Sequence, residues 1–383
     1  MKQLNYFTLA ISVAILVSCG INTSTKKWNI TACDTAIKRE DFQKEIDGKK
    51  VDLYTITNHN GMVVKITNYG ARVVSILTPD KQGNFTDVVL GYPKLEQYLK
   101  DKFYFGGIIG RYANRIAKGK FKLDGKEYSL PINSGINCLH GGLKGFDNRV
   151  WDASADSNSV TLSYTSKDME EGFPGEMKVK AKYTLTPDNE LKLEIEATAD
   201  KKTVVNLTSH SYFNLKGEGN GDIMGHLLQI NADYVTVVDT NSIPTGELIP
   251  VSGTPFDLRK EIQINQELVK NHPQLDIGKG FDHNWVLNKK ELNELSFAVK
   301  LIDPESGRVM ELYTSEPGVQ CYSGNYLDVS AIGICGKPYT FRSGIAFEPQ
   351  HFPDSPNHPN FPTTVLEPGQ TYKHISIYKF YVQ

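Results

Sequence analysis

Two short segments, far apart in the chain, contain the residues best suited to acid–base chemistry. Residues 208–215 include His210, and residues 346–350 include Glu348. Each lies at the end of an apolar run that predicts a buried β-strand, and Pro349 disfavours a helical backbone at Glu348. Imidazole titrates near neutral pH, and burial raises the pKa of a carboxyl toward the same range. The pair therefore suits a reaction in which one group donates a proton and another accepts one.

Polar residues in three other segments could bind a small ligand. His140 is followed by two glycines, which allow backbone and ligand to approach the imidazole closely. Asp282 could accept hydrogen bonds from vicinal sugar hydroxyls, and Asn114 with Arg115 forms a donor-rich pair after a glycine-rich run. Each of these residues also has a plain structural interpretation, as a satisfied histidine, a turn cap or a solvated loop arginine.

A metal site built from His140, His210 and a distant carboxylate is an alternative that the sequence leaves open. The sequence contains no HxxxH pair and no CxxC pair, which are common spacings for metal ligands. We therefore expect neither a metal nor a cofactor.

The elements that must position these side chains are short strands. Apolar residues alternate with polar ones in 177–185 and again in 191–197, on either side of a Pro-Asp-Asn turn, which predicts a β-hairpin. Asp124-Gly125 predicts a second hairpin, residues 297–301 and 309–313 a third, and residues 372–382 a final strand. Helical patterns are limited to 94–99, 260–268 and 289–295. This pattern favours an all-β fold, a large antiparallel sandwich, with residues 41–383 as a single domain.

Composition excludes one class of partner and leaves another open. The 383 residues contain 42 Lys and Arg against 44 Asp and Glu, so the formal net charge is −2 and no nucleic-acid partner is expected. Aromatic residues make up 10% of the chain, which suits strands and also suits sugar binding, although most aromatic residues belong to a core. We expect a small-molecule ligand and a monomer.

The N-terminal segment is typical of a targeting signal. Residues 6–17 are almost wholly apolar, too short for a comfortable membrane span, and Leu-Val-Ser then precedes Cys19. This resembles a bacterial lipoprotein signal. Residues 1–19 would form the signal peptide ending at Cys19, which would become the lipidated first residue after cleavage, and residues 20–40 would form a tether. The expectation is a lipid-anchored protein of a bacterial cell envelope, on its periplasmic face or outer surface; the alternative is a plain signal peptide with an incidental Cys. The four other cysteines are expected as buried free thiols.

Six segments together resemble one family, the aldose 1-epimerases or galactose mutarotases. They are GRYANRI at 110–116, LHGG at 139–142, HSYFNL at 210–215, FDHN at 281–284, GVQ at 318–320 and FEPQ at 347–350. The resemblance extends from about Val51 to the C-terminus. It implies a large antiparallel β-sandwich of the galactose mutarotase type and a cofactor-free interconversion of the α and β anomers of free aldohexoses such as glucose and galactose.

The resemblance also implies roles for individual residues. Glu348 would take the proton of the C1 hydroxyl and His210 would protonate the ring oxygen. Residues that match sugar-binding positions are His140, Asp282, Asn114, Arg115 and Gln320. Ser209 departs from the family pattern, in which Asn is more usual before the histidine.

Three other functions remain to be weighed. A hexose-6-phosphate 1-epimerase would need a cationic cluster for the phosphate, and none is evident in the matched segments. A non-catalytic sugar-binding lipoprotein would have no need of both Glu348 and His210. A glycosidase would need two carboxylates, which Asp282 and Glu348 could supply.

Overall fold

Alternation of apolar and polar residues produces long antiparallel strands in this chain. The computed structural model describes residues 29–30, 36–268 and 271–383. In β15 (Met177–Leu185) every second residue is buried, and β15 pairs with β16 (Glu190–Ala199) along its whole length. The hairpin predicted around the Pro-Asp-Asn turn is confirmed, and Asn189 in that turn takes a positive φ of 58°.

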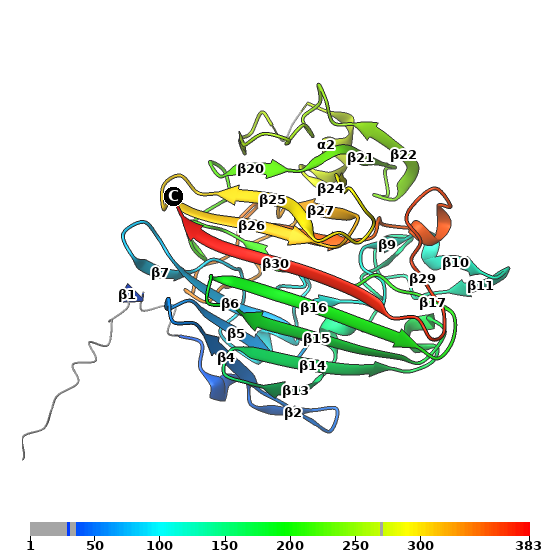
Figure 1. Cartoon of the computed structure of the whole chain (residues 1–383), viewed down its shortest axis with the longest axis horizontal. Helices are drawn as coiled ribbons and strands as arrows, with labels where there is room; N and C mark the ends of the chain where they lie inside the picture. Colours follow the sequence, from blue (N-terminus) through cyan, green and yellow to red (C-terminus); the bar gives the residue numbers. More distant parts are fainter. Residues whose placement is uncertain (1–28, 31–35, 269–270) are drawn as a thin grey trace, which may run out of the picture.

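A nine-stranded antiparallel sheet forms one layer of the sandwich. The C-terminal strand lies in the middle of this sheet, whereas the strands at its two edges come from the central part of the chain (Figure 1). The strand order is β13 (Asp152–Ala155), β14 (Ser159–Ser166), β15, β16, β30 (Tyr372–Val382), β26 (Arg308–Thr314), β25 (Ser296–Ile302), β20 (Leu227–Ile230) and β23 (Ile262–Gln263).

Two further sheets share a core with it. The six-stranded sheet has the order β19 (Tyr212–Phe213), β28 (Ile345–Gln350), β27 (Gly318–Tyr322), β24 (Asp282–Leu287), β21 (Ala232–Val238) and β22 (Pro244–Pro250). The five-stranded sheet has the order β1 (Asn29–Ile30), β7 (Asn84–Asp87), β6 (Arg72–Pro79), β5 (Val63–Thr67) and β4 (Leu53–Thr57). Val64, Ile195, Trp285 and Phe347, from all three sheets, belong to one cluster of fully buried side chains. The predicted all-β antiparallel sandwich is therefore confirmed.

Five short strand pairs in the described part of the chain lie outside these three sheets. These pairs are β8 (Ile108–Ile109) with β18 (Thr208–Ser209), β9 (Arg115–Ile116) with β12 (Cys138–Leu139), β17 (Thr203–Val204) with β29 (Val365–Leu366), β10 (Lys120–Leu123) with β11 (Lys126–Ser129), and β2 (Lys44–Ile46) with β3 (Lys49–Val51). Two of them, β8–β18 and β9–β12, lead directly to residues of the candidate site. The β10–β11 hairpin was predicted from Asp124-Gly125.

The predictions of helices were less accurate. Among the described residues, α-helix is limited to α1 (Leu95–Tyr98), which was predicted, and α2 (Pro273–Gly278), which was not. Residues 260–268 instead contain β23, because Ile262 pairs with Leu228 of β20. Residues 289–295 form a turn in which Leu292 is 72% exposed, so no apolar face is buried there. Five 3₁₀ turns complete the described part: η2 (Arg39–Phe42), η3 (Ala117–Gly119), η4 (Phe146–Asn148), η5 (Glu170–Gly172) and η6 (Ser355–Asn357).

The cysteines differ from one another. Cys138 and Cys321 are buried free thiols, as expected. Cys335 takes part in a disulfide, so the expectation of a free thiol is wrong at this position. Cys19 and Cys33 lie outside the described residues.

Candidate active site

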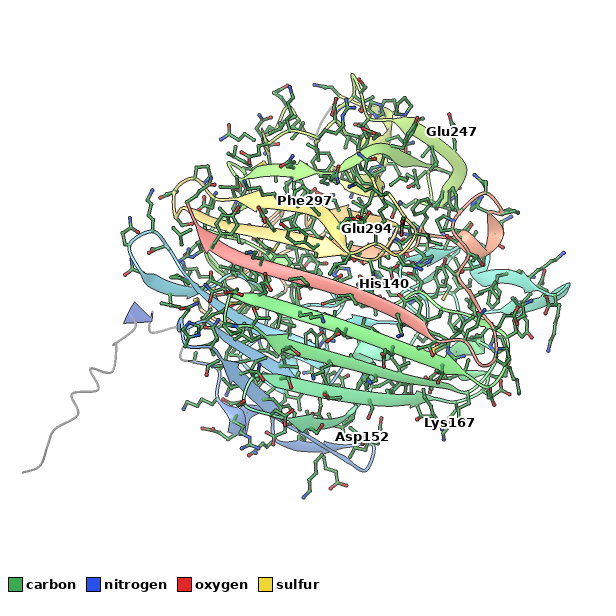
Figure 2. The ribbon with its side chains drawn as sticks, viewed as in Figure 1. His140, Asp152, Lys167, Glu247, Glu294 and Phe297 are labelled. Atoms are coloured by element: carbon green, nitrogen blue, oxygen red, sulfur yellow. The ribbon has the colours of Figure 1, made fainter. Side chains whose placement is uncertain are left out.

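The structure brings both predicted catalytic residues and four of the five predicted binding residues to one cavity of about 400 Å³. Figure 2 shows His140 within the body of the molecule, whereas Asp152 and Lys167 lie toward its edge. Gln320 does not line the cavity, but its Nε2 donates a hydrogen bond of 2.7 Å to Asp282 Oδ1. The residues that line the cavity are Lys102, Phe103, Tyr104, Asn114, Arg115, Leu139, His140, His210, Tyr212, Asp282, Tyr322, Tyr326, Asp328 and Glu348.

Strand register places the acidic part of the site. Asn284 of β24, Gln320 of β27 and Glu348 of β28 lie directly opposite one another across three strands. Asp282, two residues from Asn284, is on the same face because side chains alternate along a strand. The neighbouring residue Phe347 points into the core. The site therefore occupies the face of the six-stranded sheet that looks away from the sandwich core.

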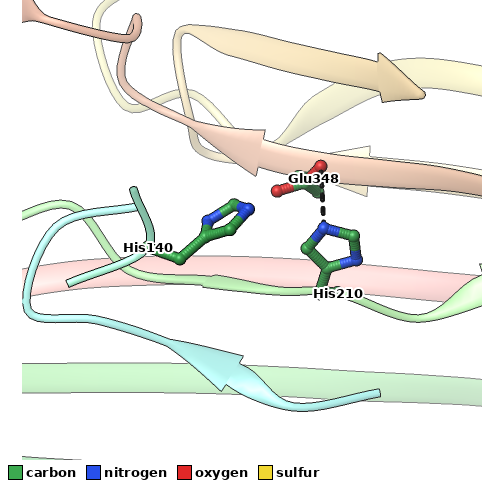
Figure 3. A group of neighbouring side chains, drawn as sticks. All are labelled: His140, His210 and Glu348. Carbon is green, nitrogen blue, oxygen red and sulfur yellow. Dashed lines mark ion pairs between the residues drawn. The ribbon is translucent and has the colours of Figure 1, made fainter. Parts of the chain in front are cut away.

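Backbone pairing brings His210 to the same place. Its N–H donates to Gly107 O and its carbonyl accepts from Gly106 N–H, both at 3.0 Å. Two residues later, Tyr212 of β19 pairs with Ala346 of β28. His210 Nε2 consequently lies 3.4 Å from Glu348 Oε1, as Figure 3 shows. Glu348 Oε2 is buried and has no hydrogen-bond partner among the described residues.

His140 follows the β9–β12 pair and has a fixed tautomer. The N–H of Asn114 donates to His140 Nδ1 at 3.2 Å, so the ring proton of the neutral imidazole is on Nε2. The two imidazole rings lie 5.2 Å apart, nearly perpendicular. The glycines after His140 serve mainly backbone packing: a Cβ on Gly141 would lie 2.0 Å from Gly110 O. The absence of a side chain at Gly141 thus lets the backbone pack closely against the loop at Gly110.

Burial dominates the electrostatics of this group. It lowers the pKa of His210 to about 3, with a smaller effect of Arg72 in the same direction. It lowers the pKa of His140 well below its usual value, helped by His210 and Arg115. It raises the pKa of Glu348 well above its usual value, and Asp282 adds to this while Arg115 opposes it. The residue type alone predicts a His210 pKa near neutrality, and desolvation of the cation lowers it. In the free protein the neutral forms of both groups are favoured.

The same three side chains could in principle hold a metal ion. Ligand atoms of His140, His210 and Glu348 all lie within 4.8 Å of one another. However, Nε2 of His140 carries the proton while Nδ1 accepts the Asn114 N–H, so this imidazole offers no lone pair toward the cavity. Only two ligands remain, and the chemistry of this set favours proton transfer.

Aromatic residues that the sequence analysis did not single out form much of the cavity wall. Tyr104 touches both imidazoles, with ring centroids 4.6 Å from His140 and 5.8 Å from His210. Tyr322 and Tyr326 are stacked, with centroids 6.3 Å apart. Aromatic faces of this kind suit the C–H surface of a sugar. The high tyrosine content was the only signal for them, and it did not distinguish these from core tyrosines.

Known proteins resemble this chain over most of its length. Galactose mutarotases from Rattus norvegicus and Bos taurus are 47% and 45% identical over 319 and 343 residues, which is 83% and 90% of this chain and 91% and 94% of theirs. The aldose 1-epimerase of Escherichia coli (strain K12) is 37% identical over 338 residues, 87% of this chain and 96% of that one.

Solved structures agree with this similarity. A GalM/aldose epimerase homologue from C. elegans has a TM-score of 0.81 at 32% identity and covers 87% of this chain and 99% of its own. A galactose 1-epimerase from Lactobacillus acidophilus has a TM-score of 0.77 at 31% identity and covers 88% of this chain and 97% of its own.

The relatives contradict the expected localisation. Proteins 45–47% identical to this chain come from mammals, so the expectation of a lipid-anchored protein in a bacterial cell envelope is wrong. That expectation rested on a short apolar run before Cys19, a compositional pattern with no packing constraint, and these residues lie outside the described part. No helix among the described residues is long and apolar enough to cross a membrane.

A family model settles the classification. The aldose 1-epimerase model matches residues 52–379, which include both catalytic candidates and all the sugar-binding candidates. The chain therefore belongs to the aldose 1-epimerase family and is an isomerase of the epimerase class.

Proposed function

We propose that the cavity at Glu348 and His210 interconverts the α and β anomers of galactose and glucose. The observation that carries this proposal is the contact of 3.4 Å between His210 Nε2 and Glu348 Oε1 inside a cavity of about 400 Å³. This volume lies within the range of small-molecule sites. The relatives named galactose mutarotase supply the choice of sugar.

Ring opening uses one base and one acid. The Glu348 carboxylate takes the proton of the C1 hydroxyl, and the C1–O5 bond breaks. The electron pair of the broken bond goes to O5, which takes a proton from the His210 imidazolium, while C1 becomes the carbonyl carbon of an aldehyde. Rotation about C1–C2 turns the other face of the carbonyl toward O5, and the reverse proton transfers close the ring to the other anomer. Each positioned group contributes roughly 10²–10⁴-fold to the rate.

The pair holds one proton throughout this cycle. The carboxylate with the imidazolium opens the ring, and the carboxylic acid with the neutral imidazole closes it. Burial favours the second form in the free protein. The first form is reached by moving the proton across the 3.4 Å between Oε1 and Nε2.

The remaining residues orient the sugar. His140 presents Nε2–H as a donor because its Nδ1 is occupied. Asp282 is held by Gln320 and lies 3.9 Å from Arg115, so its carboxylate can accept from a pair of hydroxyls. Asn114 and Arg115 also line the cavity. The two cationic side chains at the cavity, Arg115 and Lys102, each face a carboxylate, which disfavours a sugar phosphate.

Polarimetry tests the proposal. Pure α-D-galactose and α-D-glucose are dissolved with the protein, and the approach to the anomeric equilibrium is followed after subtraction of the spontaneous rate. Wild-type protein should accelerate it, and Glu348→Gln and His210→Gln should each lose the acceleration while galactose still binds in calorimetry. Full activity of either variant would exclude the assigned roles.

We further propose that residues 41–383 act as one domain and as a monomer. Strands from both ends of this range, β4 and β30, contribute to the same core. Light scattering after gel filtration should give the mass of a single chain at working concentrations; a larger mass would contradict the proposal.

A further inference from the structure

We propose that Asn206, which does not line the cavity, is a positioning residue that sets the distance between His210 and Glu348. This inference rests on the roles proposed above for these two residues. Asn206 is fully buried and lies four residues before His210, between β17 and β18. Because neither strand includes Asn206, its buried backbone groups need hydrogen-bond partners outside these two strand pairings.

The side chain of Asn206 binds the segment that follows Glu348. Its Oδ1 accepts from the N–H of His351 at 3.0 Å, and its Nδ2 donates to the carbonyl of the same residue at 3.1 Å. A side-chain amide has the donor and the acceptor of a peptide group, so it acts as a strand partner for a residue just beyond the end of β28. His351 is three residues after Glu348.

The backbone of Asn206 binds the segment that precedes Asn114 and Arg115. Its N–H donates to Arg111 O at 3.1 Å, and its carbonyl accepts from Ala113 N–H at 2.8 Å. Nδ2 also lies 3.3 Å from Ala113 O. One buried residue therefore joins three segments, each of which supplies a side chain to the cavity.

Asn206 therefore affects the relative position of the cavity residues in addition to the stability of the fold. The three segments come from positions near 113, 206 and 351. The pairing of β8 with β18 also joins the first two, but the pairing of β19 with β28 joins the last two only beyond His210, at Tyr212 and Ala346. Without the amide, the segment before His210 and the segment after Glu348 lose their direct hydrogen bonds. A displacement of about 1 Å between reacting groups can cost roughly 10²-fold in rate.

Asn68 provides a matched control. It is also buried, and its side chain also donates two hydrogen bonds and accepts one: to Lys50 O and Trp151 O, and from Asp52 N–H. None of these partners lines the cavity. Asn206→Ala and Asn68→Ala thus remove the same number and kind of contacts in different places.

The experiment compares mutarotation of α-D-galactose by the full chain and its variants, normalised to the folded fraction. We expect kcat to fall at least tenfold in Asn206→Ala, with a smaller change in KM, and to stay within twofold of wild type in Asn68→Ala. Equal kcat values for the two variants would overturn the proposal. Glu348→Gln in the same assay separates the two ideas: if it is fully active, the proposed site itself fails.

Asn206→Asp keeps the inference testable if the alanine variant does not fold. The carboxylate keeps the acceptor for His351 N–H but faces two carbonyl oxygens; its protonated form can donate to one of them and its ionised form to neither. The activity of Asn206→Asp relative to wild type should fall as the pH rises. A constant ratio across the stable pH range would overturn the proposal.

Discussion

At the scale of single residues, burial decides how the proton of the Glu348–His210 pair is held. Desolvation raises the pKa of the carboxyl and lowers that of the imidazole, so the free site keeps one proton mainly on Glu348. Loss of this proton leaves a carboxylate and a neutral imidazole, which cannot protonate O5. The alkaline limb of activity should therefore follow the pKa of Glu348 rather than that of His210.

A change at Asp282 should move this limb. Asp282 is one cause of the raised pKa of Glu348, and Arg115 opposes it. Asp282→Asn removes the negative charge, so the pKa of Glu348 should fall and the alkaline limb of kcat/KM should move to lower pH. The profile is measured by polarimetry with the spontaneous rate subtracted at each pH. A limb that stays in place would mean that another group controls it.

At the scale of elements, the site depends on short pairings rather than on the long strands. The β9–β12 pair carries Arg115 and precedes His140, and the β8–β18 pair precedes His210. Loop 101–105 is anchored by Asp101, which accepts from the N–H groups of Phe103 and Phe105 at 2.9 and 3.0 Å, and this loop presents Tyr104 to both imidazoles. Each of these local structures places side chains of the cavity, so local damage should affect activity before it affects the sandwich.

Gly141 offers a test at this scale. It has a φ of +87°, and a Cβ would lie 2.0 Å from Gly110 O, a backbone atom that cannot move alone. Gly141→Ala should lose about 2 kcal/mol or more of unfolding free energy beyond the loss in Gly83→Ala. Gly83 has a similar φ of +83° but open space around its Cβ position. Urea unfolding measures both, and equal losses would show that the close approach to Gly110 carries no cost.

At the scale of the whole molecule, buried neutral histidines make the fold sensitive to acid. Burial lowers the pKa of His226 and of His283 to about 4, and it lowers that of His210 to about 3. An unfolded imidazole titrates near pH 6.5, so between this value and the folded pKa the unfolded chain binds more protons than the folded one. Stability is therefore full above about pH 6.5 and is lost as the pH falls toward 4.

His226 should account for part of this loss. Its Nε2 accepts from Leu215 N–H at 3.0 Å and its Nδ1 lies 3.0 Å from Ile223 O, so protonation would break the first bond. In thermal unfolding, the fall in Tm from pH 7 to pH 5 should be smaller in His226→Gln than in wild type. His59→Gln, on the surface, is the control and should keep the wild-type profile. An unchanged fall in Tm for His226→Gln would contradict this prediction.

The sequence by itself determined which side chains face the core and which chemical groups are present. Period-two alternation predicted β15, β16 and β30, because strand faces depend on neighbouring residues alone. Motifs identified Glu348, His210 and the sugar-binding candidates. The helices at 260–268 and 289–295 were wrong because pairing with β20 and exposure of Leu292, which are not local properties, override propensity.

Only the tertiary structure decided how these groups act together. The distance of 3.4 Å between His210 and Glu348 arises from the register of β19 on β28 and from contacts through Asn206, which join residues more than a hundred positions apart. The tautomer of His140 follows from one hydrogen bond, which the N–H of Asn114 donates to Nδ1. The direction of each pKa shift follows from burial, and burial exists only once the sheets have packed. Residue types are written in the chain, whereas distance, desolvation and tautomer belong to the folded molecule.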